Sequence, residues 1–237
     1  MSEQYVLETR NLVKEFKGFV AVNDVNLQIR QGDIHALIGP NGAGKTTVFN
    51  LLTKFLIPTR GQILYRGEDI TPLKSAAIAR KGIVRSFQIS AVFPHMTALE
   101  NIRVALQTAE GSSYSFWKSG NSLHKLNERC MELLESVGLA EFANTTTVEL
   151  AYGRKRALEL ATTLAMEPQL LLLDEPTQGM GSEDVDRVVE LVRKAAQGRT
   201  VLMVEHNLSV VSKLCDRITV LAQGAVLTEG DYQTVSA

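Results

Sequence analysis

Cysteine is scarce in this chain, because only Cys130 and Cys215 occur among its 237 residues and neither belongs to a C-x-x-C pair. This scarcity argues against a disulfide framework or a zinc site and fits a reducing compartment. No apolar run approaches the roughly 20 residues of a membrane-spanning helix. The start, from Met1 to Tyr5, also lacks the basic and apolar regions of a signal peptide. We therefore expect a soluble, cytoplasmic protein that meets a membrane only through partners.

Charge of one sign is not in excess either, since 25 Lys and Arg residues against 26 Asp and Glu leave a net charge of -1. A nucleic-acid-binding protein usually has an excess of basic residues, so the balanced charge argues against that class of protein without excluding it. Hydrophobic residues make up 45% of the chain and charged residues 22%, which excludes a disordered or collagen-like protein. The length fits one large domain, or a core with a smaller appendage.

Strand and helix patterns alternate at both ends of the chain. The apolar run Ile34–Ile38 predicts a buried strand, and helical spacing follows it from Gly44 to Phe55. In the last third, strands are expected at Leu170–Leu173 and Thr200–Val204, each followed by a helix. This alternation is typical of βαβ units and a parallel sheet. The middle of the chain has only helical periodicity.

The simplest division is therefore a single domain made of two parts. We expect an α/β core formed by residues 1–88 and 167–237, interrupted by a helical subdomain at 89–166. Within this insertion, polar flexible stretches between 110 and 122 surround Phe116 and Trp117, whose role the sequence leaves open.

One segment matches the phosphate-binding pattern G-x-x-x-x-G-K-[ST] completely: Gly39, Pro40, Asn41, Gly42, Ala43, Gly44, Lys45 and Thr46. It lies after an apolar strand and opens a helix, as the mechanism requires. Its glycines allow backbone N–H groups to converge on phosphate oxygens, and the helix N-terminus adds positive potential. Lys45 is expected to reach the outer phosphates, and the Thr46 hydroxyl to face Mg²⁺. An incidental glycine-rich turn is a far weaker explanation.

A second motif supplies carboxylates. Asp174 ends the apolar run Leu170–Leu173, at the edge of a parallel sheet where ligands bind. A carboxylate there can hold Mg²⁺ directly or through water. Glu175 follows at once and suits a base that polarises the attacking water.

Four further features narrow the class of ATPase, since kinases, GTPases, helicases and recombinases share the motifs above. Gln88 follows a predicted strand and could bind a metal-bound water and a phosphate. His206 ends the strand pattern Val201–Glu205 and could hydrogen-bond the γ-phosphate. Leu150–Arg154 opens an apolar helix, whose first N–H groups could face an anion. Phe16 is a candidate for stacking on a base.

Together these residues resemble the ATP-binding cassette (ABC) family over nearly the whole chain. The resemblance implies that Gly39–Thr46 is the Walker A segment and Leu170–Glu175 the Walker B segment. It also implies that Gln88 is in the Q-loop, that His206 is the switch histidine and that Phe16 is the aromatic that stacks on adenine. The signature would be Leu150–Arg154, which consists of Leu150, Ala151, Tyr152, Gly153 and Arg154. The resemblance adds Thr47 to the residues that contact the nucleotide.

The resemblance also implies an architecture, a P-loop NTPase core with an antiparallel β subdomain and an inserted α-helical subdomain. ATP and Mg²⁺ are the implied cofactors, with Thr46, Gln88 and Asp174 around the metal. Lys45, Gln88, Glu175 and His206 are the implied catalytic set. The likeness is strongest to the ATPase subunits of bacterial importers for branched-chain amino acids, and of related urea and amide uptake systems.

Three departures from the family pattern stand out. Ala151 replaces the signature serine, and Arg154 stands where glutamine is usual. The segment Gln178–Gly181 lacks the aspartate common in the D-loop. These departures bear on communication across a dimer and not on ATP binding.

We therefore expect an ATPase subunit that powers an importer from the cytoplasmic face of the membrane, as a peripheral protein. Its implied partners are a second ATPase subunit, identical or homologous, the membrane permease and, indirectly, an external solute-binding protein, with no nucleic acid. The solute is expected to be an amino acid or amide. The alternatives are a DNA-repair or chromosome ATPase head and a P-loop metabolite kinase. The first would carry coiled coils or basic surfaces, and the second would leave Leu150–Arg154 unexplained.

Overall fold

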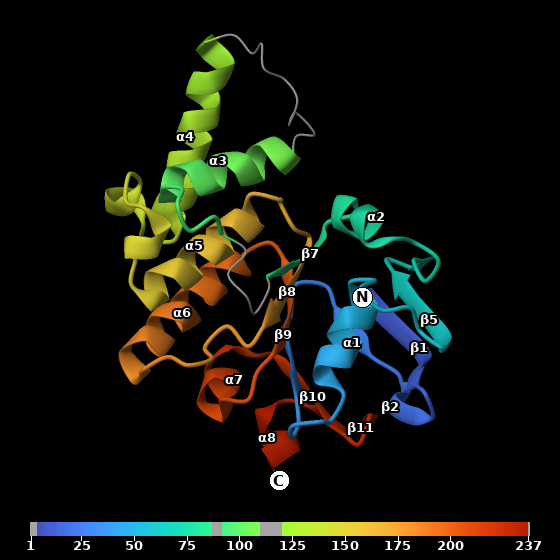
Figure 1. Cartoon of the computed structure of the whole chain (residues 1–237). Coiled ribbons are helices and arrows are strands. Elements are labelled where there is room, and N and C mark those ends of the chain that lie inside the picture. The colour runs from blue at the N-terminus through green and yellow to red at the C-terminus, as the bar shows by residue number, and fades with distance from the viewer. Residues whose placement is uncertain (1–3, 87–91, 110–119, 237) are drawn as a thin grey trace. The chain divides into compact units, whose positions relative to one another are not determined.

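The computed structural model describes residues 4–86, 92–109 and 120–236 (Figure 1). Contacts divide the chain into two compact units. The first unit comprises Met1–Arg85, Gln169–Gln178 and Ala196–Ala237, and the second comprises Ser86–Pro168 and Gly179–Ala195. Among the described residues, no helix combines the length and apolarity needed to cross a bilayer.

The first unit contains an antiparallel sheet with the strand order β2-β1-β5-β6, and β3 also pairs with β1. Its strands are β1 (Tyr5–Phe16), β2 (Phe19–Val25), β3 (Gln28–Arg30), β5 (Arg60–Tyr65) and β6 (Glu68–Asp69). β1 and β2 form a hairpin in which Phe16 pairs with Phe19. This sheet confirms the expected antiparallel β subdomain.

The second sheet of this unit is predominantly parallel and has the order β11-β10-β4-β9-β8-β7. Its strands are β4 (Ile34–Ile38), β7 (Ile83–Ser86), β8 (Leu170–Asp174), β9 (Thr200–Val204), β10 (Arg217–Ala222) and β11 (Ala225–Gly230). Every residue of β4, β8 and β9 is buried, which explains their nearly continuous apolar sequences. The predicted parallel α/β sheet is confirmed.

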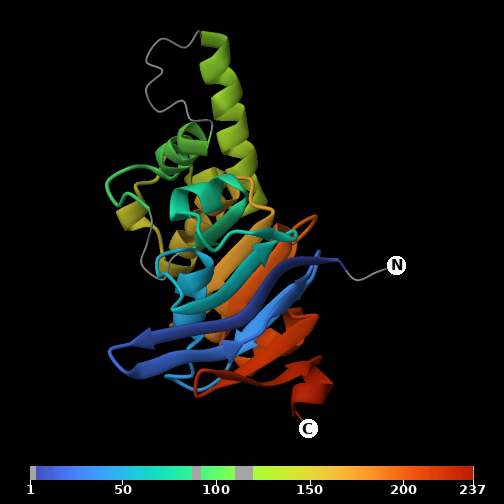
Figure 2. The ribbon, with the colours of Figure 1, turned by 90° about the vertical axis from the view of Figure 1, so that its right-hand side faces the viewer.

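One hydrophobic core joins the two sheets of the first unit. Phe49, Leu51 and Leu52 of α1 (Lys45–Leu52) are fully buried in it, together with residues of β1, β4 and β8. The sheets also meet through backbone, because Asn23 N donates to Gly224 O over 2.8 Å where β2 lies beside β11 (Figure 2). Three further helices belong to this unit: α2 (Ser75–Arg80), α7 (Leu208–Leu214) and α8 (Tyr232–Ser236).

The described part of the second unit is helical. Its helices are α3 (Ala98–Ala109), α4 (Gly120–Ser136), α5 (Tyr152–Leu164) and α6 (Ser182–Ala195), with short 3₁₀ turns η1 (Ala140–Phe142) and η2 (Thr147–Glu149). Contacts join α3 to α4 and to α5, and α5 to α6. Grouping by contacts thus adds α6 to the helices expected at 89–166. The predicted division of the chain, into an α/β core of residues 1–88 and 167–237 and a helical subdomain of residues 89–166, stays a prediction.

A polar network links β4, β10 and the edge strand β11 of the second sheet. Thr219 Oγ1 on β10 donates to Glu229 Oε2 over 2.7 Å, so His35 Nε2, 2.7 Å from the same hydroxyl, must carry the proton of that hydrogen bond. His35 Nδ1 is then unprotonated, and it has no hydrogen-bond partner in the part of the chain that the structure describes. Burial lowers the pKa of His35 to about 4; Glu229 opposes this shift, while Arg217 and Arg30 add to it.

His35 should make the fold sensitive to mild acid. Its pKa is about 4 when folded, against an ordinary value of 6.5 for an exposed histidine, so the unfolded chain binds the proton first as pH falls. Its contribution is fully present above pH 6.5 and is lost progressively toward pH 4, by roughly 3 kcal/mol in total. The free energy of unfolding of His35→Gln, followed in urea from about pH 7.5 to about pH 4.5, should fall less steeply than that of the wild type. Parallel curves would show that another group causes the acid sensitivity.

Candidate functional site

The loop between β4 and α1 has the backbone that a phosphate-binding loop needs. Gly39, Gly42 and Gly44 have φ values of 147°, 80° and 100°, which side-chain-bearing residues rarely adopt. A Cβ on Gly39 would lie 2.1 Å from Leu221 O, and one on Gly44 2.6 Å from Ala21 O. A Cβ on Gly42 would meet nothing within 4 Å. Gly39 and Gly44 therefore allow the loop to pack closely against the backbone at Leu221 and Ala21, whereas the space beside Gly42 is open.

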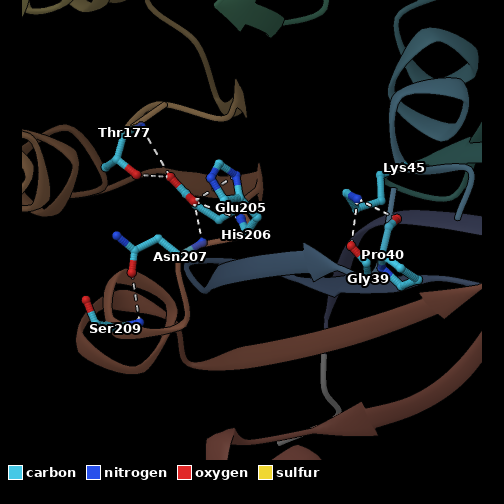
Figure 3. A network of polar contacts seen from close by, with 8 residues as sticks. All are labelled: Gly39, Pro40, Lys45, Thr177, Glu205, His206, Asn207 and Ser209. Carbon is cyan, nitrogen blue, oxygen red and sulfur yellow. Dashed lines mark hydrogen bonds and ion pairs between the residues drawn. The ribbon is translucent and has the colours of Figure 1, made fainter. Parts of the chain in front are cut away.

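The side chains of the loop divide by exposure. Ala43 and Lys45 are buried, Gly39, Gly44 and Thr47 are intermediate, and Pro40, Asn41, Gly42 and Thr46 are exposed. Lys45 Nζ turns back into the loop and donates to Gly39 O over 2.7 Å and to Pro40 O over 3.0 Å (Figure 3). The cation is thus held among carbonyls at the mouth of the loop, where an outer phosphate would be the stronger acceptor.

Asp174 ends β8 with its side chain fully buried and is paired with Arg85 of β7. Arg85 Nη1 also donates to Asn50 Oδ1 over 2.7 Å, so this pair is tied to α1. The second carboxylate oxygen of Asp174, Oδ1, has no hydrogen-bond partner within the described residues. Sequence reasoning missed Arg85, although a lone arginine in a short strand that precedes Gln88 was an available signal.

The unused Asp174 oxygen is the observation that fits a metal ion. Mg²⁺ commonly takes one or two carboxylates together with substrate phosphates and waters, so one free carboxylate oxygen beside a phosphate loop is a suitable donor. Thr46, exposed in the first turn of α1, is the second candidate ligand. Gln88, the third, lies outside the described residues.

Glu175 follows Asp174 in a strained conformation. Its φ is 47°, in the left-handed region that favours glycine, and its N–H donates to Val204 O over 2.9 Å. Such conformations cost about 1–3 kcal/mol and gather at functional sites. The strain turns the chain directly after the Asp174 strand and leaves Glu175 half-buried at the sheet edge.

His206 follows β9, the strand that lies between β4 and β8. Val204 pairs with Asp174 and with Leu37, so His206 leaves the same edge of the sheet as the phosphate loop and Glu175. Its side chain is 57% exposed. The structure therefore brings the sequence-predicted loop, carboxylates and histidine to one edge of a single unit. It also reveals a buried neighbour that sequence reasoning left unassigned, Glu205.

Phe16 stands at the tip of the β1–β2 hairpin and is 40% exposed. Lys14 Nζ lies 5.0 Å from its ring centroid, and its hairpin partner Phe19 is 67% exposed. An exposed aromatic pair at a hairpin tip is suited to stacking on a planar ring. The assignment of Phe16 to adenine stacking stays a prediction.

The predicted signature residues lie in the second unit, at the start of α5. Leu150 is buried, Ala151 is the N-cap residue without a side-chain cap, and Tyr152 is 50% exposed. The Arg154 guanidinium lies 3.9 Å from the Phe142 ring centroid, a cation–π contact within the unit. Gly153 has a local packing reason, because a Cβ there would come 3.0 Å from Asp184 Oδ1.

A glycine-rich phosphate loop between a buried strand and a helix, with carboxylates at the ends of nearby strands, defines a P-loop NTPase. The family model described as ABC transporter matches residues 22–178. The chain therefore belongs to the ABC transporter family and is one of its ATPase domains.

Curated relatives match over nearly the full length. The chain is 41% identical to the high-affinity branched-chain amino acid transport ATP-binding protein BraF of Pseudomonas aeruginosa, over 97% of this chain and 93% of the relative. It is 40% identical to the corresponding protein LivG of Escherichia coli K12, over 98% and 94%. These relatives confirm the resemblance to the branched-chain amino acid importer branch.

A solved structure shows the same fold. The ATP-binding cassette MJ0796, as a dimer in a post-hydrolysis state with ADP and phosphate bound, superposes with a TM-score of 0.80. The two sequences are 28% identical, and the superposition covers 95% of this chain and 98% of the MJ0796 chain. The expected class of fold and enzyme is thus confirmed, and nucleotide binding with it.

The Arg85–Asp174 pair should be a major determinant of stability. Arg85→Leu leaves the buried Asp174 carboxylate without its counter-charge, and removing one partner of a buried pair costs about 3–5 kcal/mol. Urea unfolding should show this loss. Lys81→Leu is the matched control, because it removes a more exposed pair of 2.7 Å with Glu68 in the same unit and should cost less than about 1 kcal/mol. Equal losses in the two variants would contradict the assignment.

Proposed function

We propose that this chain is the ATP-hydrolysing subunit of an importer for branched-chain amino acids or related small amino and amide solutes. The observation that carries the proposal is the 41% and 40% identity, over nearly the whole chain, to two transport ATP-binding proteins named for these solutes. The complete phosphate loop and the buried Asp174 beside a strained Glu175 support the ATPase half of the proposal.

The catalytic groups come from three adjacent strand ends. Lys45 exchanges its bonds to Gly39 O and Pro40 O for the outer phosphates of ATP. Thr46, Asp174 and Gln88 would hold Mg²⁺, which would supply positive charge beside the phosphates. Glu175 orients the attacking water and accepts its proton, and His206 donates a hydrogen bond to the terminal phosphate.

The functional unit is a dimer of ATPase subunits, as in the MJ0796 cassette. Each phosphate loop then faces the segment Leu150–Arg154 of the second subunit, identical or homologous. Because Ala151 offers no hydroxyl, the backbone N–H groups at the start of α5 supply the contact with phosphate. The Arg154 guanidinium lies against the Phe142 ring, and this contact leaves its N–H groups able to donate to a phosphate.

The permease docks on the loop before α3, at the cytoplasmic face of the membrane. Phe93 and Met96 are 50% and 37% exposed in this loop, and Val148, 54% exposed, is tied to it through a bond from its N–H to Pro94 O. Exposed apolar side chains gathered in one place are typical of a protein contact.

A buried asparagine holds this docking loop in shape. Asn101 is 2% exposed; its Oδ1 accepts from Phe93 N over 2.7 Å, and its Nδ2 donates to Thr97 O over 2.9 Å and to Thr147 Oγ1 over 3.0 Å. The loop therefore presents Phe93 and Met96 as a preformed surface.

Binding and chemistry should separate at Lys45 and Glu175. Lys45→Ala removes the cation that meets the outer phosphates, so ATP affinity measured by calorimetry with Mg²⁺ should fall sharply while the fold survives. Glu175→Gln keeps the shape of the side chain without its basicity. It should therefore bind ATP normally, accumulate as a dimer, and release phosphate about 10²–10⁴-fold more slowly. Wild-type phosphate release by Glu175→Gln would place the base elsewhere.

Transport should depend on the docking loop. In cells lacking this chain, radiolabelled leucine uptake should be lost and the wild-type gene should restore it. Phe93→Glu places a charge in the apolar contact, so it should restore neither uptake nor co-purification of the permease, although its basal ATPase activity stays intact. Phe55→Glu is the control, because Phe55 is similarly exposed, at 58%, outside the docking loop. Intact leucine, valine and urea uptake in cells without this chain would overturn the proposed solutes.

A further inference from the structure

Glu205 is a fully buried carboxylate that accepts four hydrogen bonds from two separate segments. Its Oε1 accepts from Thr177 N over 3.2 Å and from the Thr177 hydroxyl (Figure 3). Its Oε2 accepts from His206 N over 2.8 Å and from Asn207 N over 3.0 Å. The side chain has 0% exposure. A buried carboxylate is costly unless it is paired and hydrogen-bonded, so this full set of donors is what makes its position tolerable.

The two segments are the exits of neighbouring strands. Thr177 lies three residues beyond Asp174, the end of β8, and His206 and Asn207 follow β9. The strands themselves pair in parallel up to Asp174 and Val204. Beyond that point the ladder ends, and Glu205 continues the connection through its side chain. One carboxylate thus fixes how both chain segments leave the sheet.

The arrangement constrains His206 through its backbone and leaves its ring accessible. His206 N is bonded to Glu205, while its side chain is 57% exposed and its Nδ1 lies 3.9 Å from Glu205 Oε2. The next residue is fixed as well, because Asn207 Oδ1 accepts from Ser209 N over 3.1 Å and caps α7. The imidazole therefore projects from a backbone held on both sides.

We propose that Glu205 is a positioning residue of the ATPase reaction, which sets the backbone of His206 and locks it to the segment that begins at Thr177. The inference rests on the proposed role of His206 at the terminal phosphate. Glu205 itself touches no reacting atom in this arrangement. It makes the switch histidine and the exit from the Asp174–Glu175 strand move as one body, so that His206 meets the phosphate only when Glu175 is also in place.

Glutamine cannot replace Glu205 in this role. A glutamine has the same length, but only one of its two terminal atoms accepts hydrogen bonds. Its amide nitrogen would face either the N–H groups of His206 and Asn207, which can only donate, or Thr177, whose N–H can only donate and whose hydroxyl would have to turn and accept. In either orientation at least one backbone N–H loses its acceptor, so the connection between the two segments is weakened while the shape and volume of the buried side chain are kept.

ATP binding should be nearly independent of Glu205. Lys45 is bonded to Gly39 and Pro40, and none of these residues is among the four hydrogen-bond donors of Glu205 (Figure 3). The test therefore compares kcat with the affinity for ATP. In Glu205→Gln, kcat should fall by about tenfold, within the range of coupling between hydrogen-bonded neighbours. The dissociation constant for ATP with Mg²⁺ should stay within about twofold of the wild-type value.

The decisive measurement is a double-mutant cycle with His206→Ala, by single-turnover phosphate release. If Glu205 acts through His206, Glu205→Gln should cause no further loss in the His206→Ala background. A full further loss of about tenfold would show that Glu205 acts independently of His206 and would overturn the inference. Wild-type turnover by His206→Ala would instead remove the proposed role of the histidine itself, so the two failures are distinguishable.

A milder variant and a matched control separate positioning from stability. Thr177→Val removes only the hydroxyl bond and should lower kcat by a smaller factor, and Thr177→Ser should restore it. Glu229→Gln is the control, because Glu229 also accepts from a threonine hydroxyl, Thr219 Oγ1, at the far strand of the sheet. It should leave kcat unchanged. An unchanged kcat in Glu205→Gln would overturn the inference. So would losses of kcat in Glu205→Gln, Thr177→Val and Glu229→Gln that simply follow the fall in melting temperature of each variant.

Discussion

The buried parallel pairing of β4, β9 and β8 is the constraint on which the proposed catalytic edge of the sheet depends. All three strands are fully buried and adjacent, so their carboxyl ends meet at one edge of the sheet. The phosphate loop, the Asp174–Glu175 pair and His206 each begin where one of these strands stops. Because the register is fixed residue by residue, from Leu37 to Val204 to Asp174, a shift of one strand would displace its catalytic group from the other two.

Buried polar groups make this sheet specific as well as stable. Asp174 is held by Arg85, Glu205 by four donors, and His35 by Thr219. Each would be costly in another register, because its partners come from neighbouring strands or strand exits. The proposed role of Glu205 extends this principle from stability to catalysis, since the donors that satisfy its buried charge belong to two segments of the proposed catalytic site.

The second unit presents its functional surfaces on short, well-braced segments. The proposed docking loop is held by Asn101, and the start of α5 carries the predicted signature residues. Arg154 shows how local packing modifies an assignment by position, because its guanidinium is engaged by Phe142 within the unit. That cation–π contact fixes the position from which the guanidinium N–H groups could donate to a phosphate.

Much of this protein was determined by the sequence alone. The glycine pattern of 39–44 requires left-handed backbone, and the apolar runs before Gly39 and Asp174 require buried strands, so the fold class and the nucleotide site could be predicted. The pairing of Arg85 with Asp174, the strain at Glu175 and the network around Glu205 could not. The contacts among these features join residues up to 89 positions apart, as Arg85 and Asp174 are. Local sequence patterns carry no information about which distant group satisfies a buried charge. Only the tertiary structure decides that, because a buried carboxylate is stable solely where the folded chain brings donors to it.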